Sequence, residues 1–364
     1  MSSAEGQAAG GNTAQEVGAA TGTVPAPEAG PTAIGKAPRF QPRQGLVLEI
    51  LERFGLVFLL AGEIVLFCAW SKTGATFRTW GNFRQIVANQ SVLSVAALAS
   101  ILPLIGGSFD LSVGAVALLS DIVCAAALSH HHAPLGVAIV IAVAFGAFIG
   151  LCNGLVVAKA GVNALITTLG TFYVIIGLII WYTNGYSIVS GIPTSLTDLS
   201  AQRWVGVPRI AVFMIAAAIV VWYLLAHTPW GRYLQSVGSN PIAARLVGIN
   251  IDFVVVISFV LSGTFAAIAG VLALAHDGNA SPNIQSASGL LLPALASAFL
   301  GATTIRPGRF NVLGTLVAIF FIAVAVVGLT LAGVANWVQY VLYGAALVVA
   351  VALTAVIGRR RGRV

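Results

Sequence analysis

Long apolar runs separated by short polar breaks make up the chain from about residue 46 to its C-terminus. A membrane-spanning helix needs about 20 predominantly apolar residues to cross about 30 Å of hydrocarbon. The runs therefore predict ten membrane-spanning helices. Their approximate ranges are 54–71, 86–105, 112–129, 134–158, 162–182, 209–226, 253–275, 289–304, 312–331 and 337–357.

Two stretches of the chain contain residues that interrupt a straight spanning helix. Pro103 is followed by the glycine-rich segment 106–114, which carries Asp110. Helix breakers and a carboxylate at membrane depth are tolerated only where they face protein or water. The run 289–304 contains Pro293 and rises only about 24 Å as a helix. Short or broken helices of this kind tend to line a transport pathway.

The two ends of the chain differ from these runs. Residues 1–45 hold 8 Gly, 10 Ala and 5 Pro, which predicts a disordered cytoplasmic tail. Residues 46–358 are predicted to form one transmembrane domain, and residues 359–364 a basic cytoplasmic C-terminus. The chain does not open with a basic stretch and an apolar core, so we expect the first apolar run to act as an uncleaved anchor.

Composition and charge also indicate a membrane protein. Apolar residues make up 58% of the chain and charged residues only 8%, whereas soluble domains average about a quarter charged. With the N-terminus inside, thirteen Lys and Arg lie on the cytoplasmic side and five outside, which obeys the positive-inside rule and places both termini in the cytoplasm. The net charge of +7 then belongs mainly to cytoplasmic loops and does not indicate nucleic-acid binding. We expect an all-α, polytopic helix bundle.

Few side chains at membrane depth carry reactive chemistry. The acids predicted to lie there are Glu63, Asp110 and Asp121, and no Lys or Arg is predicted beside them. Three scattered acids without basic partners do not favour a proton or sodium relay. For Asp121 a functional and a structural role are equally favoured, and for Glu63 a structural one is favoured. The sequence offers no nucleophile with a base, no paired catalytic carboxylates and no metal-ligand spacing. We therefore expect no enzymatic activity, cofactor or metal in this chain.

Three glycines, Gly146, Gly150 and Gly154, recur at four-residue spacing in the run 134–158. This spacing aligns their bare faces along one side of a helix and favours the close approach of a neighbouring helix. Contact with a substrate is the less favoured interpretation.

The polar loop between the runs 209–226 and 253–275 predicts a short helix of its own. Asn240 is a good N-cap, Pro241 suits the first helical turn and Gly248 can end the helix. Such a helix on the cytoplasmic side can provide a contact surface for a partner protein. A simple connector is the alternative.

The same loop resembles the coupling segment of permease subunits from ATP-binding-cassette (ABC) importers of ribose, xylose and related monosaccharides, in the branched-chain and ribose permease family. The residues that match the family pattern here are Gly231, Arg232, Tyr233, Gly238, Asn240, Ala243, Ala244, Arg245, Leu246 and Gly248. Three further stretches agree, in family order: Gly106-Gly107 with 110–114; Asn153-Gly154 with 166–171; and 300–302 with Gly308-Arg309 and Gly314-Thr315. Together they cover nearly all of residues 82–357.

The resemblance implies a subunit of a larger machine in the bacterial cytoplasmic (inner) membrane. It implies a homodimer, or a pair with a related permease, within the lipid bilayer. Two cytoplasmic ATPase subunits would grip the coupling segment and hydrolyse ATP, and a periplasmic or extracellular binding protein would deliver the sugar. One residue departs from the family pattern, because Ile242 stands where a Glu often precedes the paired alanines. Coupling here is therefore expected to rely on packing more than on charge.

The translocation path is expected to use the sparse polar groups of the spans at a dimer-axis channel. The candidates are Asn89, Asp110, Ser112, Asn153, Thr167, Thr168 and Thr171, with Gln90 and Ser94 beside them. For the threonines, a hydrogen bond to their own helix is an equal alternative. A secondary carrier or facilitative channel for a small polar solute is the alternative function, suggested by Asp110 and Asp121. Pentose, hexose, deoxysugar, polyol and sugar-like signalling molecules are all open as substrates.

Overall fold

The computed structural model describes residues 46–204 and 206–360, with side chains described except those of 46–49, 51–52 and 354–360. The predicted tail 1–45 and most of the predicted basic C-terminus, residues 361–364, lie outside the described residues. The predicted transmembrane domain, residues 46–358, lies within them apart from residue 205.

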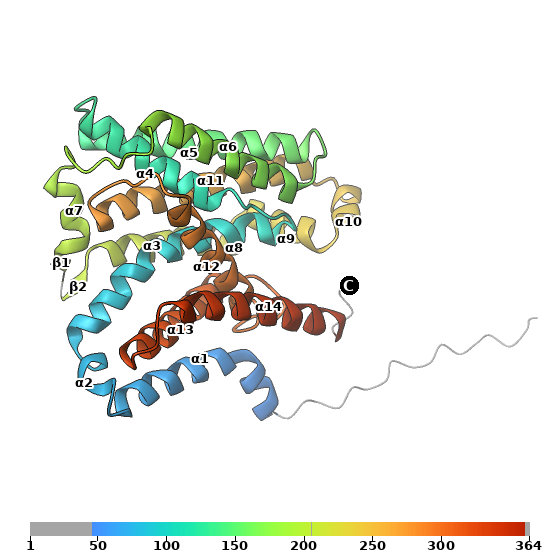
Figure 1. Ribbon diagram of the computed structural model, residues 1–364. Helices are drawn as coiled ribbons and strands as arrows, with labels where there is room; N and C mark the ends of the chain where they lie inside the picture. The colour runs from blue at the N-terminus through green and yellow to red at the C-terminus, as the bar shows by residue number, and fades with distance from the viewer. Residues whose placement is uncertain (1–45, 205, 361–364) are drawn as a thin grey trace, which may run out of the picture. The chain divides into compact units, whose positions relative to one another are not determined.

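Each of the ten predicted ranges overlaps one long helix (Figure 1). These helices are α1 (Leu46–Ala69), α3 (Trp80–Ile105), α4 (Val113–Ser129), α5 (Leu135–Ala158), α6 (Ala164–Thr183), α8 (Ile210–His227), α11 (Ile251–Asp277), α12 (Ile284–Gly301), α13 (Val312–Leu331) and α14 (Trp337–Arg360). Among the described residues, seven of them are long and apolar enough to cross a membrane. The all-α membrane bundle is thereby confirmed, while the count of ten spans and their orientation stay predictions.

Short elements join the long helices. They are α2 (Gly74–Phe77), α7 (Thr194–Ala201), α9 (Pro229–Ser239), α10 (Pro241–Leu246) and the antiparallel strands β1 (Arg203–Trp204) and β2 (Val207–Pro208). Figure 1 shows α7 and the strands at one end of the long helices and α10 at the other.

The predicted break after α3 is confirmed, whereas α12 is longer than its apolar run suggests. Residues 106–112 are not helical and separate α3 from α4. α12 starts at Ile284, five residues before the predicted start, because the side chain of Asn283 accepts a hydrogen bond from the backbone N–H of Gln285 (2.9 Å). Pro293 lies inside this helix and does not divide it.

α11 is the central helix of one group and contacts α5, α3 and α4. The predicted glycine face of α5 is confirmed as its contact with α11: a Cβ added at Gly146, Gly150 or Gly154 would overlap the backbone or side chains of α11. The close approach extends to Gly263 of α11, which lies against the backbone of Gly146.

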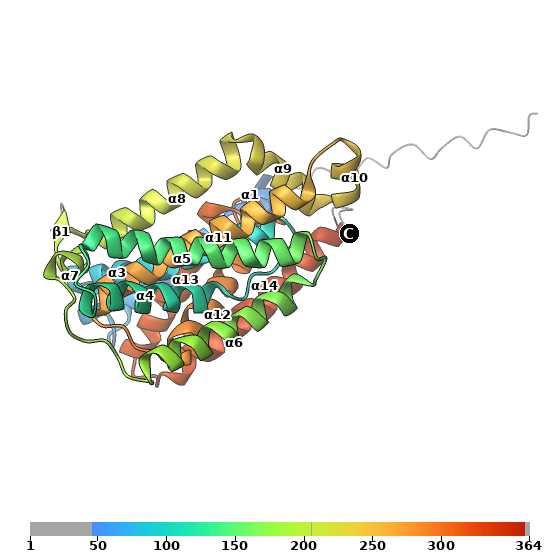
Figure 2. The ribbon, with the colours of Figure 1, turned by 90° about the horizontal axis from the view of Figure 1, so that it is seen from above.

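α12 connects this group to a second one, because it contacts α3 and α4 as well as α13 and α14, while α1 packs on α13. Figure 2 shows α8 and α6 on opposite sides, with α4, α5 and α11 between them. In the most apolar stretch of α3, 89% of the residues are buried, whereas in that of α5 only 22% are buried. α3 is thus an interior helix, and the outer face of α5 is available to lipid or to another subunit.

Candidate functional site

Two short capped helices, α9 and α10, fill the loop between α8 and α11. α9 follows Thr228, whose Oγ1 accepts a hydrogen bond from the backbone N–H of Gly231 (3.1 Å). The side chain of Asn240 accepts from the N–H of Ala243 (3.0 Å) and starts α10, as predicted. Gly248 then adopts a left-handed backbone conformation (φ 85°) beyond the end of α10, where glycine is favoured.

α9 was not predicted as a helix, and it rests directly on the end of α3. Leu234 and Val237, three residues apart, are buried beneath it. A Cβ added at Gly238 would overlap the carbonyl oxygen of Ile105, and one at Gly106 would meet the side chain of Leu234 (2.8 Å). The signal in the sequence was Thr228 followed by Pro229, an N-cap with proline at the first helical position.

α10, in contrast, presents apolar side chains to its surroundings. Ile242, Leu246 and Val247, the apolar tip, are 76%, 83% and 76% exposed. Only Ala244 of α10 is buried, and Arg245 is exposed beside the tip. Clustered exposed apolar side chains outside the long apolar helices are typical of a protein contact surface.

The predicted coupling residues therefore lie together on α9, α10 and their junctions, but with different exposure. Gly231 and Ala244 are buried. The others are exposed: Arg232, Tyr233, Gly238, Asn240, Ala243, Arg245, Leu246 and Gly248.

A buried polar network surrounds the break between α3 and α4. Asp110 is 2% exposed and its Oδ1 accepts hydrogen bonds from the backbone N–H (3.0 Å) and Oγ (2.6 Å) of Ser112. Its Oδ2 accepts from Oγ of Ser262 in α11 (2.7 Å). Buried carboxylates are tolerated when their acceptors are satisfied in this way.

The network continues into α5 and α6. The amide nitrogen of Asn153 donates to Oγ of Ser112 (3.0 Å), and Thr171 donates from its hydroxyl to Oδ1 of Asn153 (2.6 Å). Thr168 accepts a hydrogen bond from the backbone N–H of Leu111 (3.0 Å). The break is thus held by side chains from α5, α6 and α11.

Five of the seven predicted path residues meet in this network: Asp110, Ser112, Asn153, Thr168 and Thr171. The other two lie apart from it. Thr167 donates to the carbonyl of Asn163 in its own helical turn (3.0 Å), and Asn89 lies in the N-terminal half of α3. Ser262 belongs to this network but was not predicted from the sequence. The sequence feature that marks it is a hydroxyl residue followed by glycine within the apolar run 253–275.

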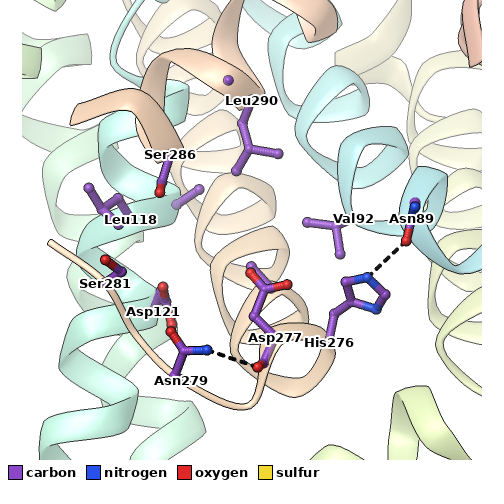
Figure 3. Close-up of a pocket in the computed structure, with 13 residues that line it drawn as sticks. Asn89, Val92, Leu118, Asp121, His276, Asp277, Asn279, Ser281, Ser286 and Leu290 are labelled. Atoms are coloured by element: carbon purple, nitrogen blue, oxygen red, sulfur yellow. Dashed lines mark hydrogen bonds between the residues drawn. The ribbon is translucent and has the colours of Figure 1, made fainter. Parts of the chain in front are cut away.

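Asn89 belongs instead to a polar cavity of about 450 Å³ between α3, α4, α11 and α12 (Figure 3). This cavity lies near the C-terminal end of α11, whereas α10 lies just before the N-terminal end of the same helix. The cavity and α10 are therefore at opposite ends of a 27-residue helix. The lining residues are Asn89, Val92, Ala117, Leu118, Asp121, Ala273, His276, Asp277, Asn279, Ser281, Ser286, Gly289 and Leu290. The cavity combines two carboxylates with neutral polar groups and has no Lys or Arg in its lining.

His276 is fixed at the edge of this cavity. Its Nε2 lies 2.9 Å from Oδ1 of Asn89, and its Nδ1 lies 2.7 Å from the hydroxyl oxygen of Ser200 in α7. An imidazole protonated at Nε2 satisfies both contacts, because it donates to Asn89 and accepts from Ser200.

The amino-acid sequence of the chain matches a known family. Residues 82–351 match the family described as branched-chain amino acid transport system, permease component. The chain belongs to this permease family. The match begins in α3 and ends in α14, and so contains the break, α9, α10 and the cavity.

Individual permeases of this family are similar over most of their length. The ribose import permease protein RbsC of Escherichia coli is 32% identical over 83% of this chain and 93% of its own length. The D-allose transport system permease protein AlsC of the same species is 28% identical over 85% and 93%. The autoinducer 2 import system permease protein LsrD of Salmonella paratyphi B is 29% identical over 71% and 79%. No solved structure is significantly similar.

Family membership agrees with the seven helices in the described part of the chain that are long and apolar enough to cross a membrane. The permease is a multi-pass protein of the bacterial inner membrane. As the permease component of a transport system, it works with other components of that system.

Proposed function

We propose that this permease is the membrane subunit of an ATP-driven ABC importer that moves a monosaccharide or a close relative of one into the cytoplasm. The similarity to a ribose import permease and a D-allose transport system permease over more than four fifths of this chain carries the proposal. Two ATPase subunits hydrolyse ATP, an external binding protein delivers the sugar, and two permease chains, identical or related, enclose the path. The chain itself performs no covalent chemistry and needs no cofactor.

The proposed orientation has both termini in the cytoplasm and ten spans. α9 and α10 then face the cytoplasm, and the polar cavity lies towards the outside. The thirteen-to-five distribution of Lys and Arg supports this orientation.

The apolar tip of α10 is proposed to insert into the ATPase subunit. Leu246 is 83% exposed and Ile242 76%, which supports a contact made by packing. The exposed Arg245 adds a charge at the edge of that contact.

Movement of α10 is proposed to reach the path through α9. Gly238 touches the carbonyl of Ile105 without an intervening side chain, so α9 cannot tilt towards α3 without displacing residues 106–112. Asp110 ties that segment to Ser262 of α11. Closure of the ATPase pair would thereby shift the broken segment against α5, α6 and α11 and change the access of the path.

A gradient-driven carrier is the less favoured function. The carboxylate oxygens of Asp110 accept three hydrogen bonds inside the subunit, which suits a positioning role more than a proton relay.

Reconstitution tests the proposed function directly. The permease is placed in liposomes with its ATPase and binding protein, and uptake of D-ribose and D-allose is measured with and without ATP. We expect uptake that requires ATP and is indifferent to collapsed proton and sodium gradients. Uptake that proceeds unchanged without ATP would refute an ABC importer.

A single substitution tests the docking of α10. Leu246→Asp places a charge on the apolar tip and should reduce recovery of the ATPase in co-purification by at least about tenfold, since burying an unpaired carboxylate costs several kcal/mol. Val189→Asp is the matched control, because Val189 is similarly exposed (69%) in the connection before α7. Equal ATPase recovery with the two variants would show that the ATPase is held elsewhere.

A further inference from the structure

We infer that the cavity between α3, α4, α11 and α12 is a binding site for one neutral, polyhydroxylated molecule within a single permease subunit. This inference rests on the proposed function and adds to it a specific site and a chemical class of ligand. It differs from a path formed only along the axis between two subunits.

The first support is an unpartnered carboxylate oxygen. Asp121 is 7% exposed, lines the cavity, and its Oδ1 has no hydrogen-bond partner among the described residues. A buried carboxylate oxygen without a donor is energetically unfavourable. Oδ1 is shielded from solvent in the observed rotamer, so rotation of the Asp121 carboxylate towards the cavity would let a ligand hydroxyl supply the missing donor. Figure 3 shows Asp121 and Asp277 on facing sides of the same space.

The second support is the chemistry of the lining. Asp121 and Asp277 are acceptors when ionised, and Ser281 and Ser286 can donate and accept. Without a Lys or Arg in the lining, a carboxylate or phosphate on the ligand would meet two acids and no counter-charge. The cavity therefore disfavours phosphorylated sugars, and a zwitterionic amino acid would pair its ammonium group with the acids but leave its carboxylate without a counter-charge. The cavity favours a molecule rich in O–H donors.

The third support is size and order. A volume of about 450 Å³ lies within the range of small-molecule sites and can hold one monosaccharide with some water. His276 and Asn89 are held by each other and by Ser200, so this wall is ordered before a ligand binds. Pre-ordered polar groups lower the entropic cost of binding.

Cysteine protection tests the site without needing transport. Ser286, exposed at the cavity, is replaced by Cys in a permease whose Cys68, Cys124 and Cys152 are changed to Ala. The rate of modification by a charged methanethiosulfonate reagent is measured with D-ribose or L-leucine. Ser288→Cys is the matched control on the same helix, since Ser288 does not line the cavity and donates to the carbonyl of Ile284 (3.0 Å).

We expect D-ribose to slow modification of the Ser286→Cys variant by the factor 1 + [ribose]/Kd, about fivefold at four times Kd. L-leucine should give no protection, and modification of the Ser288→Cys variant should not respond to either. Adding Asp121→Asn should raise the ribose concentration needed for the same protection by at least about tenfold. Adding Asp198→Asn, which lies outside the cavity, should leave that concentration unchanged.

Three results would overturn the inference: no protection at any ribose concentration, equal protection by L-leucine, or undiminished protection with Asp121→Asn. The proposed function fails separately. If the reconstituted permease takes up D-ribose with ATP but ribose gives no protection, the site is wrong and the importer stands. If ribose protects but uptake ignores ATP, the site stands and the importer is wrong.

Discussion

Ser262→Ala should destabilise the permease far more than the loss of one hydroxyl usually does. Hydrogen bonds between membrane helices average about 0.6 kcal/mol and reach about 1.7 kcal/mol. Here the acceptor is Oδ2 of Asp110, and Ser262 is its hydrogen-bond donor at 2.7 Å. Because the carboxylate is 2% exposed, the substitution leaves that oxygen buried without a donor, which costs about 1–3 kcal/mol. The desolvation of the acceptor dominates, so we expect a loss of about 1.5–3 kcal/mol.

The control lies one helical turn away. Ser258 is as buried as Ser262, but its hydroxyl donates to the carbonyl of Val255 within α11 (2.7 Å). Ser258→Ala removes a bond to a carbonyl within the same helix and should cost less than about 1 kcal/mol. The free energy of unfolding is measured for both variants by titration with a denaturing detergent. Equal losses in the two variants would refute the idea that Asp110 depends on α11.

Two further predictions concern helix packing and helix capping. Gly150→Ala should lower the free energy of unfolding by about 1–3 kcal/mol, because its Cβ would overlap the backbone of α11, whereas Gly177→Ala, with open space around it, should be neutral or stabilising in the same titration. Asn240→Ala removes the N-cap of α10, which contributes about 1 kcal/mol, and should lower ATPase recovery in co-purification by about fivefold. Ser239→Ala, one residue earlier, should leave the recovery unchanged. A larger loss with Ser239→Ala than with Asn240→Ala would contradict the role of the cap.

Local features of this chain could be predicted from its sequence. The ten apolar runs mark ten helices because apolar length and polar breaks are written directly into the chain. α10 follows from Asn240, Pro241 and Gly248, whose effects act within one helical turn. The packing of Gly150 follows from its four-residue spacing.

Long-range pairings could not be predicted in this way. Ser262 meets Asp110 across 152 positions, and His276 meets Asn89 across 187. Many serines lie in apolar runs of this chain, and nothing local distinguishes the one that reaches a carboxylate. The cavity likewise depends on how α3, α4, α11 and α12 are spaced, which only their packing decides.

The proposed coupling segment contacts α11 directly at Trp230 of α9, whose Nε1 donates to the carbonyl of Val254 (3.4 Å), and it has two further connections to that helix. One is covalent, because α10 leads into the N-terminus of α11 through residues 247–250. The other runs from α9 at Gly238 to Ile105, along the broken segment, and through Asp110 to Ser262, eleven residues into α11. A force on α10 therefore acts on α11 at its start and near its middle, about 16 Å apart.

Forces applied at two separate points along a helix rotate the helix as well as shift it. On the proposed function, that rotation would carry His276 and Asp277, at the far end of α11, relative to Asp121 on α4. Binding of ATP at one face would then change the sugar cavity at the other.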